Sequence, residues 1–189
     1  MWDTVRQWLH TLPVREEVVE SYKNGQDVKA REKMHAASTL AGMAFNTASL
    51  GINHSLAHAA GAKFHVPHGR LNSILMPHVI QYNAGIEFNN RNRQATDKTV
   101  ASRYQDIAKL LGCSASSPVS GVRQLVEAIK KLQRKLEMPT SLREYGVKTD
   151  VFAQYKVEIS EAALHDGCTP TNPRVPTAEE LLKVLEKAF

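Results

Sequence analysis

The chain has 189 residues, of which 42% are hydrophobic and 6% aromatic, and its formal net charge is +5. This size and hydrophobic content predict one domain with a core built mainly from aliphatic side chains, and exclude a chain too polar to fold. No apolar run approaches the length of a bilayer span, and the opening MWDTVRQWLH carries charges where a signal peptide needs an apolar stretch. We therefore expect a cytoplasmic protein without a membrane partner.

The positive charge raises the question of nucleic-acid binding. In residues 125–136, however, basic side chains such as Lys130 and Arg134 are interleaved with Leu and Ile at helical spacing. That pattern is typical of the solvent-facing side of an amphipathic helix, so we predict no nucleic-acid partner. The two cysteines, Cys113 and Cys168, are far apart and lack metal-type spacing, and we expect both to be free thiols.

In chain order, residues 1–25 predict two short helical pieces that are separated at Pro13 and end at Asn24-Gly25. An apolar stripe runs along them, made of Trp2, Val5, Trp8 and Leu9. Exposure of this stripe would favour self-association. A single long helix is expected next, over residues 28–60. Its richness in small residues between 36 and 51 favours a buried central helix that neighbours approach closely.

The rest of the chain also predicts helices. They are expected at about residues 67–84, 98–111, 120–136 and 150–164, and Pro77 should bend the first of them. Thr177 and Glu180 have the spacing of a capping box that opens the last helix, which runs to residue 187. No segment alternates as a strand would, so the predicted fold class is all-α, a helical bundle.

Three histidines stand out between residues 51 and 83. His54 and His58 are four residues apart, which places both side chains on one face of a helix. Pro67-His68-Gly69 adds another imidazole from a bend. Imidazole is the commonest metal ligand and titrates near neutral pH, so the cluster indicates a metal site or a proton relay. The pair alone is weak evidence, because helices carry it by chance.

The stretch GINHSLAHAAGAKFHVPHGRLNSILMPHVIQYN, residues 51–83, resembles the histidine signature of the iron-dependent (group III) alcohol dehydrogenases. Residues 30–45 resemble the preceding helix of that family, and CTPTNPR, residues 168–174, is similar to its segment before the last helix. The likeness is greatest to the ethanol, propanol and bifunctional aldehyde-alcohol dehydrogenase branch. It implies the helical C-terminal domain of these enzymes, whose fold is dehydroquinate-synthase-like.

The resemblance also implies roles for the histidines. His54 and His68 match iron ligands of the family, and Zn²⁺ would suit the same atoms. His58 matches the residue beside the nicotinamide, which helps in proton transfer or positioning. His65 and His78 match no ligand position. Glu161 and His165 are four residues apart but match a different helix of the family, so a solvated pair is expected.

Other parts of the family pattern are missing from these residues. The Asp and His that complete the iron site lie upstream of anything present, and no glycine-rich turn of an α/β cofactor domain occurs. Two imidazoles without a carboxylate are a poor ferrous site, so weak metal binding is expected of the chain alone. The resemblance thus divides the chain into residues 1–25, a remnant helical segment, and residues 26–189, the C-terminal helical domain.

Two functions are compatible with this pattern. The first is part of an NAD(P)-dependent, iron-containing alcohol dehydrogenase that acts on a small alcohol or aldehyde, catalytically incomplete by itself. The second is a non-catalytic helical assembly or scaffold domain, which pairs with a separate chain that supplies the cofactor half. A homo-oligomer, or association with such a cofactor-domain chain, is expected in either case.

Overall fold

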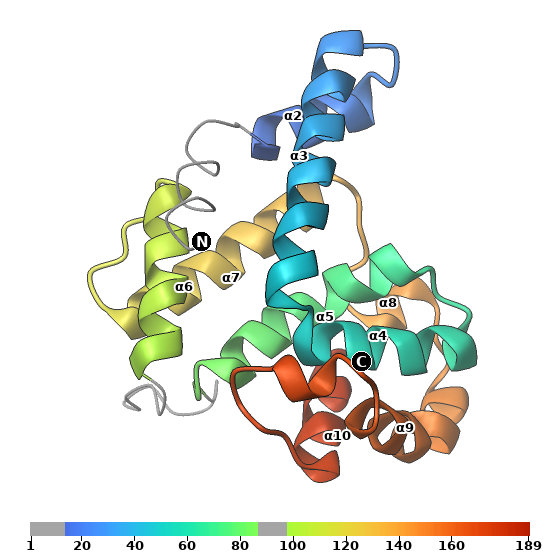
Figure 1. Ribbon diagram of the computed structural model, residues 1–189. Helices are drawn as coiled ribbons and strands as arrows, with labels where there is room; N and C mark the ends of the chain where they lie inside the picture. The colour runs from blue at the N-terminus through green and yellow to red at the C-terminus, as the bar shows by residue number, and fades with distance from the viewer. Residues whose placement is uncertain (1–13, 87–97) are drawn as a thin grey trace.

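Helices dominate the computed structural model, which describes residues 14–86 and 98–189 (Figure 1). The helices are α2 (Val14–Lys23), α3 (Val28–Ala48), α4 (Gly51–Phe64), α5 (His68–Asn83), α6 (Lys98–Leu110), α7 (Pro118–Lys135), α8 (Leu142–Tyr145), α9 (Thr149–Leu164) and α10 (Ala178–Lys187), with a 3₁₀ turn, η1 (Thr169–Thr171). These described ranges contain no strand, which confirms the predicted all-α fold class. The predicted stripe of Trp2, Val5, Trp8 and Leu9 lies outside the described residues.

The larger of two hydrophobic cores lies among α4, α5, α8, α9 and α10. Its fully buried side chains include Ile52, Leu56, Leu71, Leu75, Leu142, Ile159, Leu181 and Leu185. The chain end closes this core, because the ring of Phe189 stacks on Phe152 with centroids 4.1 Å apart. The last helix begins with the predicted capping box, in which Thr177 and Glu180 cap each other's backbone amides.

A second core joins the end of α5 to α6 and α7, which pack against each other and lie next to one another in Figure 1. Val122 and Val126 are among its buried residues. The two helices approach closely at Gly121, where an added Cβ would lie 2.5 Å from the Cα of Gln105. Only a glycine allows this contact, so the α6–α7 packing depends on that position.

The expected single helix over residues 28–60 is wrong, because the chain breaks between α3 and α4. Ser49 adopts φ 60° and ψ −171°, and Gly51 has φ 64°. Both values leave the right-handed helical region, so the hydrogen-bond ladder ends and α4 starts in a new direction. The break turns the histidine-bearing helix away from α3 and onto the larger core.

The expectation that the small-residue helix is buried is also wrong for α3. Ala30 is the only buried residue of this helix, and Met43 and Phe45 are 62% and 48% exposed. The main packing partner of α3 among the described residues is α2, and the two project from the molecule at the top of Figure 1. We refer to residues 14–48 as the arm and to residues 51–86 and 98–189 as the body.

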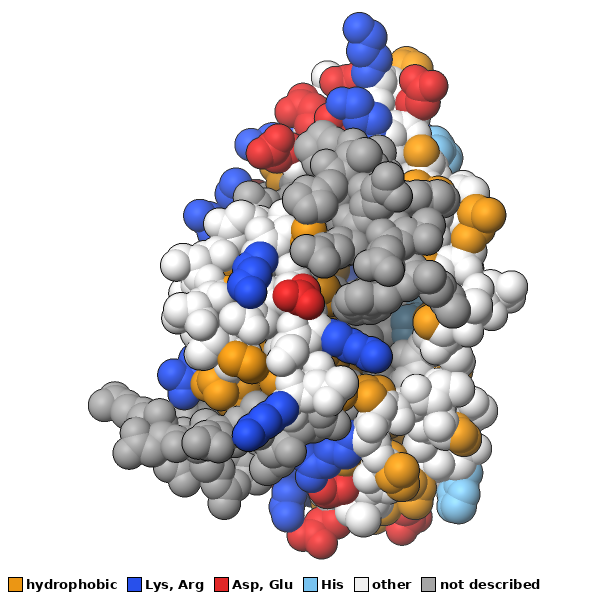
Figure 2. Space-filling view, turned by 60° about the vertical axis from the view of Figure 1, so that its left-hand side comes forward, with side chains coloured by type: hydrophobic (Ala, Val, Ile, Leu, Met, Phe, Trp, Pro, Cys, Tyr) orange, Lys and Arg blue, Asp and Glu red, His pale blue; other side chains and the backbone are white. Residues whose placement is uncertain are grey.

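Charges are distributed rather than gathered on the face shown in Figure 2, where Lys and Arg side chains stand singly among uncharged and acidic ones. Across the described residues, several Lys side chains form ion pairs, for example Lys156 with Glu186 at 2.6 Å and Lys63 with Glu158 at 2.6 Å. Among the described helices, none combines the length and the apolar character that a membrane span requires.

Candidate active site

The start of α4 is held by a segment more than a hundred residues further along the chain. No side chain at the preceding residue caps the helix; instead Thr171 Oγ1 accepts the Gly51 N–H at 3.3 Å and Asn172 Oδ1 accepts the Ile52 N–H at 3.4 Å. Asn172 is fixed in turn by paired amide hydrogen bonds with Asn83 of α5, at 2.8 and 3.2 Å. The segment 168–174 therefore sets the position of the helix that carries His54 and His58.

Three histidine rings converge above α4 and α5. His54 and His58 lie on one face of α4, and His68 is the first residue of α5, directed by Pro67 before it. The ring centroids are separated by 5.1 Å for His54 and His68, 5.4 Å for His58 and His68, and 6.0 Å for His54 and His58. The structure thus brings together all three residues singled out in the sequence.

His54 is the most enclosed of the three rings. Burial, and then the neighbouring His68 and His58 imidazoles, lower the pKa of His54 below its ordinary value, although Asp166 opposes this shift. Its Nδ1 atom is buried and has no hydrogen-bond partner among the described residues. An unpaired buried nitrogen is costly unless something binds it, and a neutral imidazole is the form that binds metals. His54 therefore fits the role of a metal ligand.

His68 is supported by an amide from the next turn of α5. The Asn72 Nδ2 atom lies 3.0 Å from His68 Nε2 and 3.3 Å from Nδ1, and it also donates to the His68 carbonyl at 3.1 Å. Asn53 of α4 donates to Asn72 Oδ1 at 2.7 Å, which ties the two helices together here. An ion bound by His68 would replace the contact of Asn72 with one ring nitrogen.

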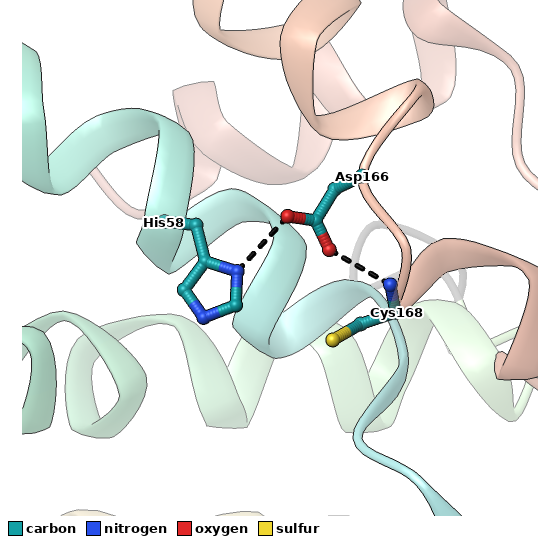
Figure 3. Close-up of side chains that lie close together, drawn as sticks. All are labelled: His58, Asp166 and Cys168. Atoms are coloured by element: carbon teal, nitrogen blue, oxygen red, sulfur yellow. Dashed lines mark hydrogen bonds and ion pairs between the residues drawn. The ribbon is translucent and has the colours of Figure 1, made fainter.

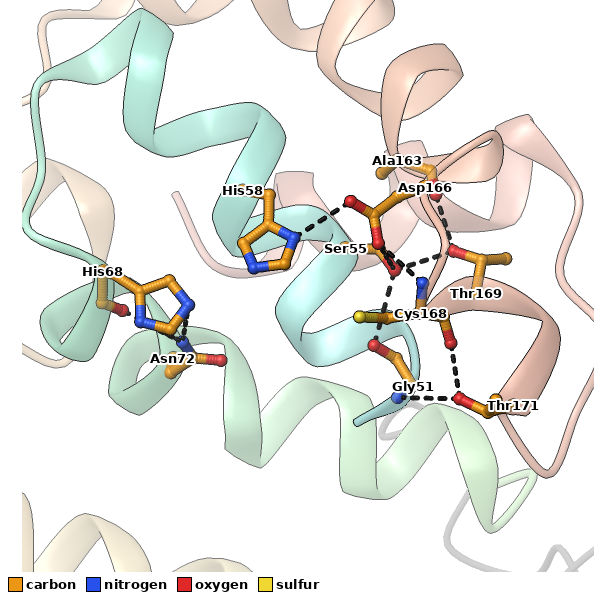
Figure 4. Close-up of polar contacts among 10 residues, drawn as sticks. All are labelled: Gly51, Ser55, His58, His68, Asn72, Ala163, Asp166, Cys168, Thr169 and Thr171. Carbon is orange, nitrogen blue, oxygen red and sulfur yellow. Dashed lines mark hydrogen bonds and ion pairs between the residues drawn. The ribbon is translucent and has the colours of Figure 1, made fainter. Parts of the chain in front are cut away.

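Asp166, which no sequence pattern had singled out, lies in the turn after α9 and accepts a hydrogen bond from His58 Nδ1 at 2.9 Å (Figure 3). Its other carboxylate oxygen accepts from the Cys168 amide at 2.8 Å and from the Ser55 hydroxyl at 3.1 Å. Ser55 Oγ also lies 2.8 Å from Thr169 Oγ1, within hydrogen-bond distance (Figure 4). His58 is thus held by a network that joins α4 to the turn before η1.

Partial burial works against ionisation of Asp166, but the hydrogen bonds from the Cys168 amide, His58 and Ser55 outweigh it. The pKa of the Asp166 carboxyl therefore lies below its ordinary value. An ionised carboxylate can only accept hydrogen bonds, so the proton of the contact with His58 sits on the imidazole Nδ1. In the neutral ring, Nε2 is then the atom with a free lone pair.

His65, His78 and His165 lie apart from this cluster. His65 is exposed at the end of α4, with φ 52°. His78 is partly buried in α5, where burial, followed by Lys130 and Lys187, lowers its pKa to about 4. Glu161 and His165 are both exposed, and neither belongs to the cluster.

Comparison with known proteins gives a consistent result. The family model described as "Fe-containing alcohol dehydrogenase family, C-terminal" matches residues 11–189. The chain is 39% identical over 181 residues to an aldehyde-alcohol dehydrogenase of Streptococcus pneumoniae, covering 92% of this chain and 20% of that protein. It is 40% identical over 176 residues to an NADPH-dependent butanol dehydrogenase of Clostridium saccharobutylicum, covering 93% and 42%.

Solved structures agree. A 1,3-propanediol oxidoreductase matches with a TM-score of 0.80 and 32% identity, and an alcohol dehydrogenase from Oenococcus oeni with a TM-score of 0.81 and 28% identity. Each match covers 96% of this chain and 44% of the other. The chain spans less than half the length of the relatives described here. Family model, relatives and fold together place this chain in the Fe-containing alcohol dehydrogenase family, where it corresponds to the C-terminal region.

Proposed function

We propose that this chain supplies metal-binding helices to an iron-dependent alcohol dehydrogenase, which interconverts a small alcohol and its aldehyde with NAD or NADP. The observation that carries this proposal is the convergence of the His54 and His68 rings, 5.1 Å apart on two different helices. The names of the relatives, an aldehyde-alcohol dehydrogenase and a butanol dehydrogenase, support the substrate class.

His54 and His68 would hold Fe²⁺, or Zn²⁺ in its place, through neutral ring nitrogens. When bound, the ion would polarise the alcohol oxygen as a Lewis acid, while a nicotinamide ring would accept the hydride. Two imidazoles fill only part of such a coordination shell. We propose that a cofactor-binding domain of the kind present in the longer relatives, in the same or in a separate chain, completes the site.

His58 is proposed to move the proton of the reaction. Because Nδ1–H donates to the ionised Asp166, the lone pair of Nε2 is free to take a proton from the alcohol and return it in the reverse direction. The hydrogen bond also fixes the ring plane, since Asp166 is itself anchored by Ser55 and by the Cys168 amide. His58 would therefore act from a defined position on α4.

The test joins this chain to the N-terminal part of the C. saccharobutylicum butanol dehydrogenase, which provides a cofactor domain from a relative. The chimera should retain iron after gel filtration and reduce an aldehyde with NADPH. His54→Ala and His68→Ala should each abolish iron retention, measured by elemental analysis. A folded chimera that binds NADPH but retains no iron would contradict the ligand assignment.

His58→Ala should leave iron bound in the same chimera and lower kcat by roughly 100-fold, the usual contribution of a positioned acid or base. His165→Ala is the matched control, because this exposed histidine lies outside the cluster, and it should change neither value. Equal loss of iron in the His54, His58 and His68 variants would contradict the separation of roles.

The second candidate function is an assembly domain that pairs with a cofactor-binding chain. The exposed apolar side chains of the arm, Met43 and Phe45, favour it, since such side chains are commonly covered by a partner. Analytical ultracentrifugation of the chain alone and mixed with the N-terminal part of the butanol dehydrogenase shows whether the chain self-associates or pairs with a cofactor-binding chain. A homo-oligomer in the first sample would favour self-association, and a mixed complex in the second would favour pairing.

A further inference from the structure

We propose that His58, Asp166 and Cys168 form a binding site for a thiophilic divalent cation such as Zn²⁺. One nitrogen of the imidazole, one carboxylate oxygen and the thiol sulfur all lie within 4.8 Å of one another (Figure 3). The site uses neither His54 nor His68. It therefore goes beyond the proposed iron-dependent function and does not depend on it.

The three donors are suited to zinc in kind. Zinc binds imidazole nitrogen, carboxylate oxygen and thiolate sulfur, and three protein ligands with one open position are a common zinc arrangement. Zinc, cobalt and cadmium ions bind a thiolate ligand more strongly than ferrous iron or magnesium does. The donor set therefore favours a soft or borderline ion.

Two of the donors are held in place by contacts outside the ligand set. The Cys168 amide donates to Asp166 at 2.8 Å, so the carboxylate and the residue that bears the thiol are fixed to one turn. Ser55, buried on α4, donates to the same carboxylate at 3.1 Å. Such outer hydrogen bonds orient ligands before the ion arrives.

An ion can reach the site from solvent. The His58 side chain is 44% exposed, that of Asp166 is 22% exposed, and Cys168 is partly buried. Burial and then the Asp166 carboxylate raise the pKa of the Cys168 thiol, because a thiolate beside that carboxylate is disfavoured. A divalent cation between the two groups replaces this repulsion with attraction to both.

Binding of the ion releases one proton from the site. The Cys168 thiol loses its proton to solvent as the sulfur binds the ion. The neutral His58 ring moves its proton from Nδ1 to Nε2, so that Nδ1 is free to bind. Asp166, already ionised, exchanges its hydrogen bond with His58 for a bond to the ion. Each ion bound thus releases one proton, and its two positive charges are neutralised by the carboxylate and the thiolate.

Cobalt(II) is the probe, because a thiolate bound to it gives a charge-transfer absorption in the near ultraviolet that imidazole and carboxylate ligands do not give. Titration of Co²⁺ into the reduced 189-residue chain should produce this absorption with one thiolate per ion, and Zn²⁺ should abolish it by displacement. Cys168→Ser should remove it. The other free thiol provides the matched control, and Cys113→Ser should leave the absorption unchanged.

Zn²⁺ affinities of variants, measured by competition with Co²⁺, test which side chains are ligands of the ion. We expect Cys168→Ser and His58→Ala each to weaken Zn²⁺ binding by at least about tenfold, and Ser55→Ala, which removes an outer hydrogen bond, by roughly tenfold. The double variant His54→Ala, His68→Ala should keep the absorption. Circular dichroism of each variant shows whether it is folded, and Cys168→Ala replaces Cys168→Ser if the latter is not.

The proposal is wrong if wild-type chain binds Co²⁺ without the thiolate absorption, or if the absorption persists in folded Cys168→Ser. It is also wrong if loss of His54 and His68 abolishes the absorption. None of these results bears on iron retention by the chimera, so the cation site is tested separately from the proposed iron ligands His54 and His68.

Discussion

The arm and the body contain helices of similar composition that are buried to very different degrees. α3 in the arm and α4 in the body are both rich in Ala, Gly and other small residues. Of the 21 residues of α3 one is buried, whereas seven of the 14 residues of α4 are. The difference arises because α4 packs against α5, α9 and η1, while the main described neighbour of α3 is α2. Small residues permit close packing, but neighbouring helices are needed to produce it.

All three histidines of the cluster belong to the body, where α4 and α5 are fixed by the larger core and by the segment 168–174. Their ring positions are therefore determined by packing in the best-buried part of the molecule. Because the main described neighbour of α3 is α2, we predict that the site geometry and the stability of the arm are only weakly linked.

The largest expected effect comes from emptying the core beneath the histidines. Leu56 is fully buried on α4, so Leu56→Ala should lower the free energy of unfolding by about 3 kcal/mol, measured by urea denaturation. Met43→Ala is the matched truncation in the arm, and it should change stability by less than about 0.5 kcal/mol because the side chain is 62% exposed. Similar losses in both variants would show that the arm is packed after all.

Two glycines provide a second contrast. Gly51 has φ 64°, and an added Cβ would lie 2.9 Å from Asn172 Oδ1, so Gly51→Ala should destabilise the chain by about 2 kcal/mol. In the arm, the nearest atom to a Cβ at Gly42 is 4.0 Å away and the residue is helical, so Gly42→Ala should stabilise α3 by about 0.5–1 kcal/mol. Thermal melts of both variants test this prediction, because the melting temperature should fall in Gly51→Ala and rise in Gly42→Ala. A stabilising Gly51→Ala would contradict the tight start of α4.

Lowering the pH should destabilise the body because His78 is protonated more readily in the unfolded chain. Burial first, and then Lys130 and Lys187, lower its pKa to about 4, below the value of 6.5 expected in the unfolded chain. The unfolded chain therefore binds this proton more readily, and the stability contributed by neutral His78 is lost as the pH falls from 6.5 towards 4. We expect a loss of about 1–2 kcal/mol after allowance for solvent screening. His78→Gln should flatten that part of the stability–pH curve, and an unchanged curve would contradict this assignment.

Much of the body could be predicted from local patterns. The helices expected near residues 98–111, 120–136 and 150–164 occur as α6, α7 and α9 within a few residues at each end. Thr177 with Glu180 starts α10 as expected, because capping depends on residues within a single turn, whereas α7 starts two residues earlier than expected, at Pro118, where Ser117 caps it. The break at Ser49 was missed, since no proline marks it and its positive φ has no sequence signal other than Gly51.

The candidate site was predictable only in part. The spacing of His54 and His58 and the bend at His68 allowed the cluster to be proposed, and the four-residue repeat of a helix makes such neighbours visible along the sequence. Asp166 could not be found in this way, because it lies 108 residues from His58. The only sequence feature that pointed to Asp166 was its place in HDGC, just before residues 168–174, which resemble a segment of the family.

Amino-acid order alone established α5, α6, α7, α9 and α10, the capping box that begins α10, and which face of a helix bears the two imidazoles, since these depend on interactions within one or two turns. Three-dimensional packing decided that α3 is exposed, that Thr171 and Asn172 cap α4, and that Asp166 holds His58. Such contacts join residues more than a hundred positions apart. They form only where burial of a shared core brings distant segments together, and no local pattern encodes that outcome.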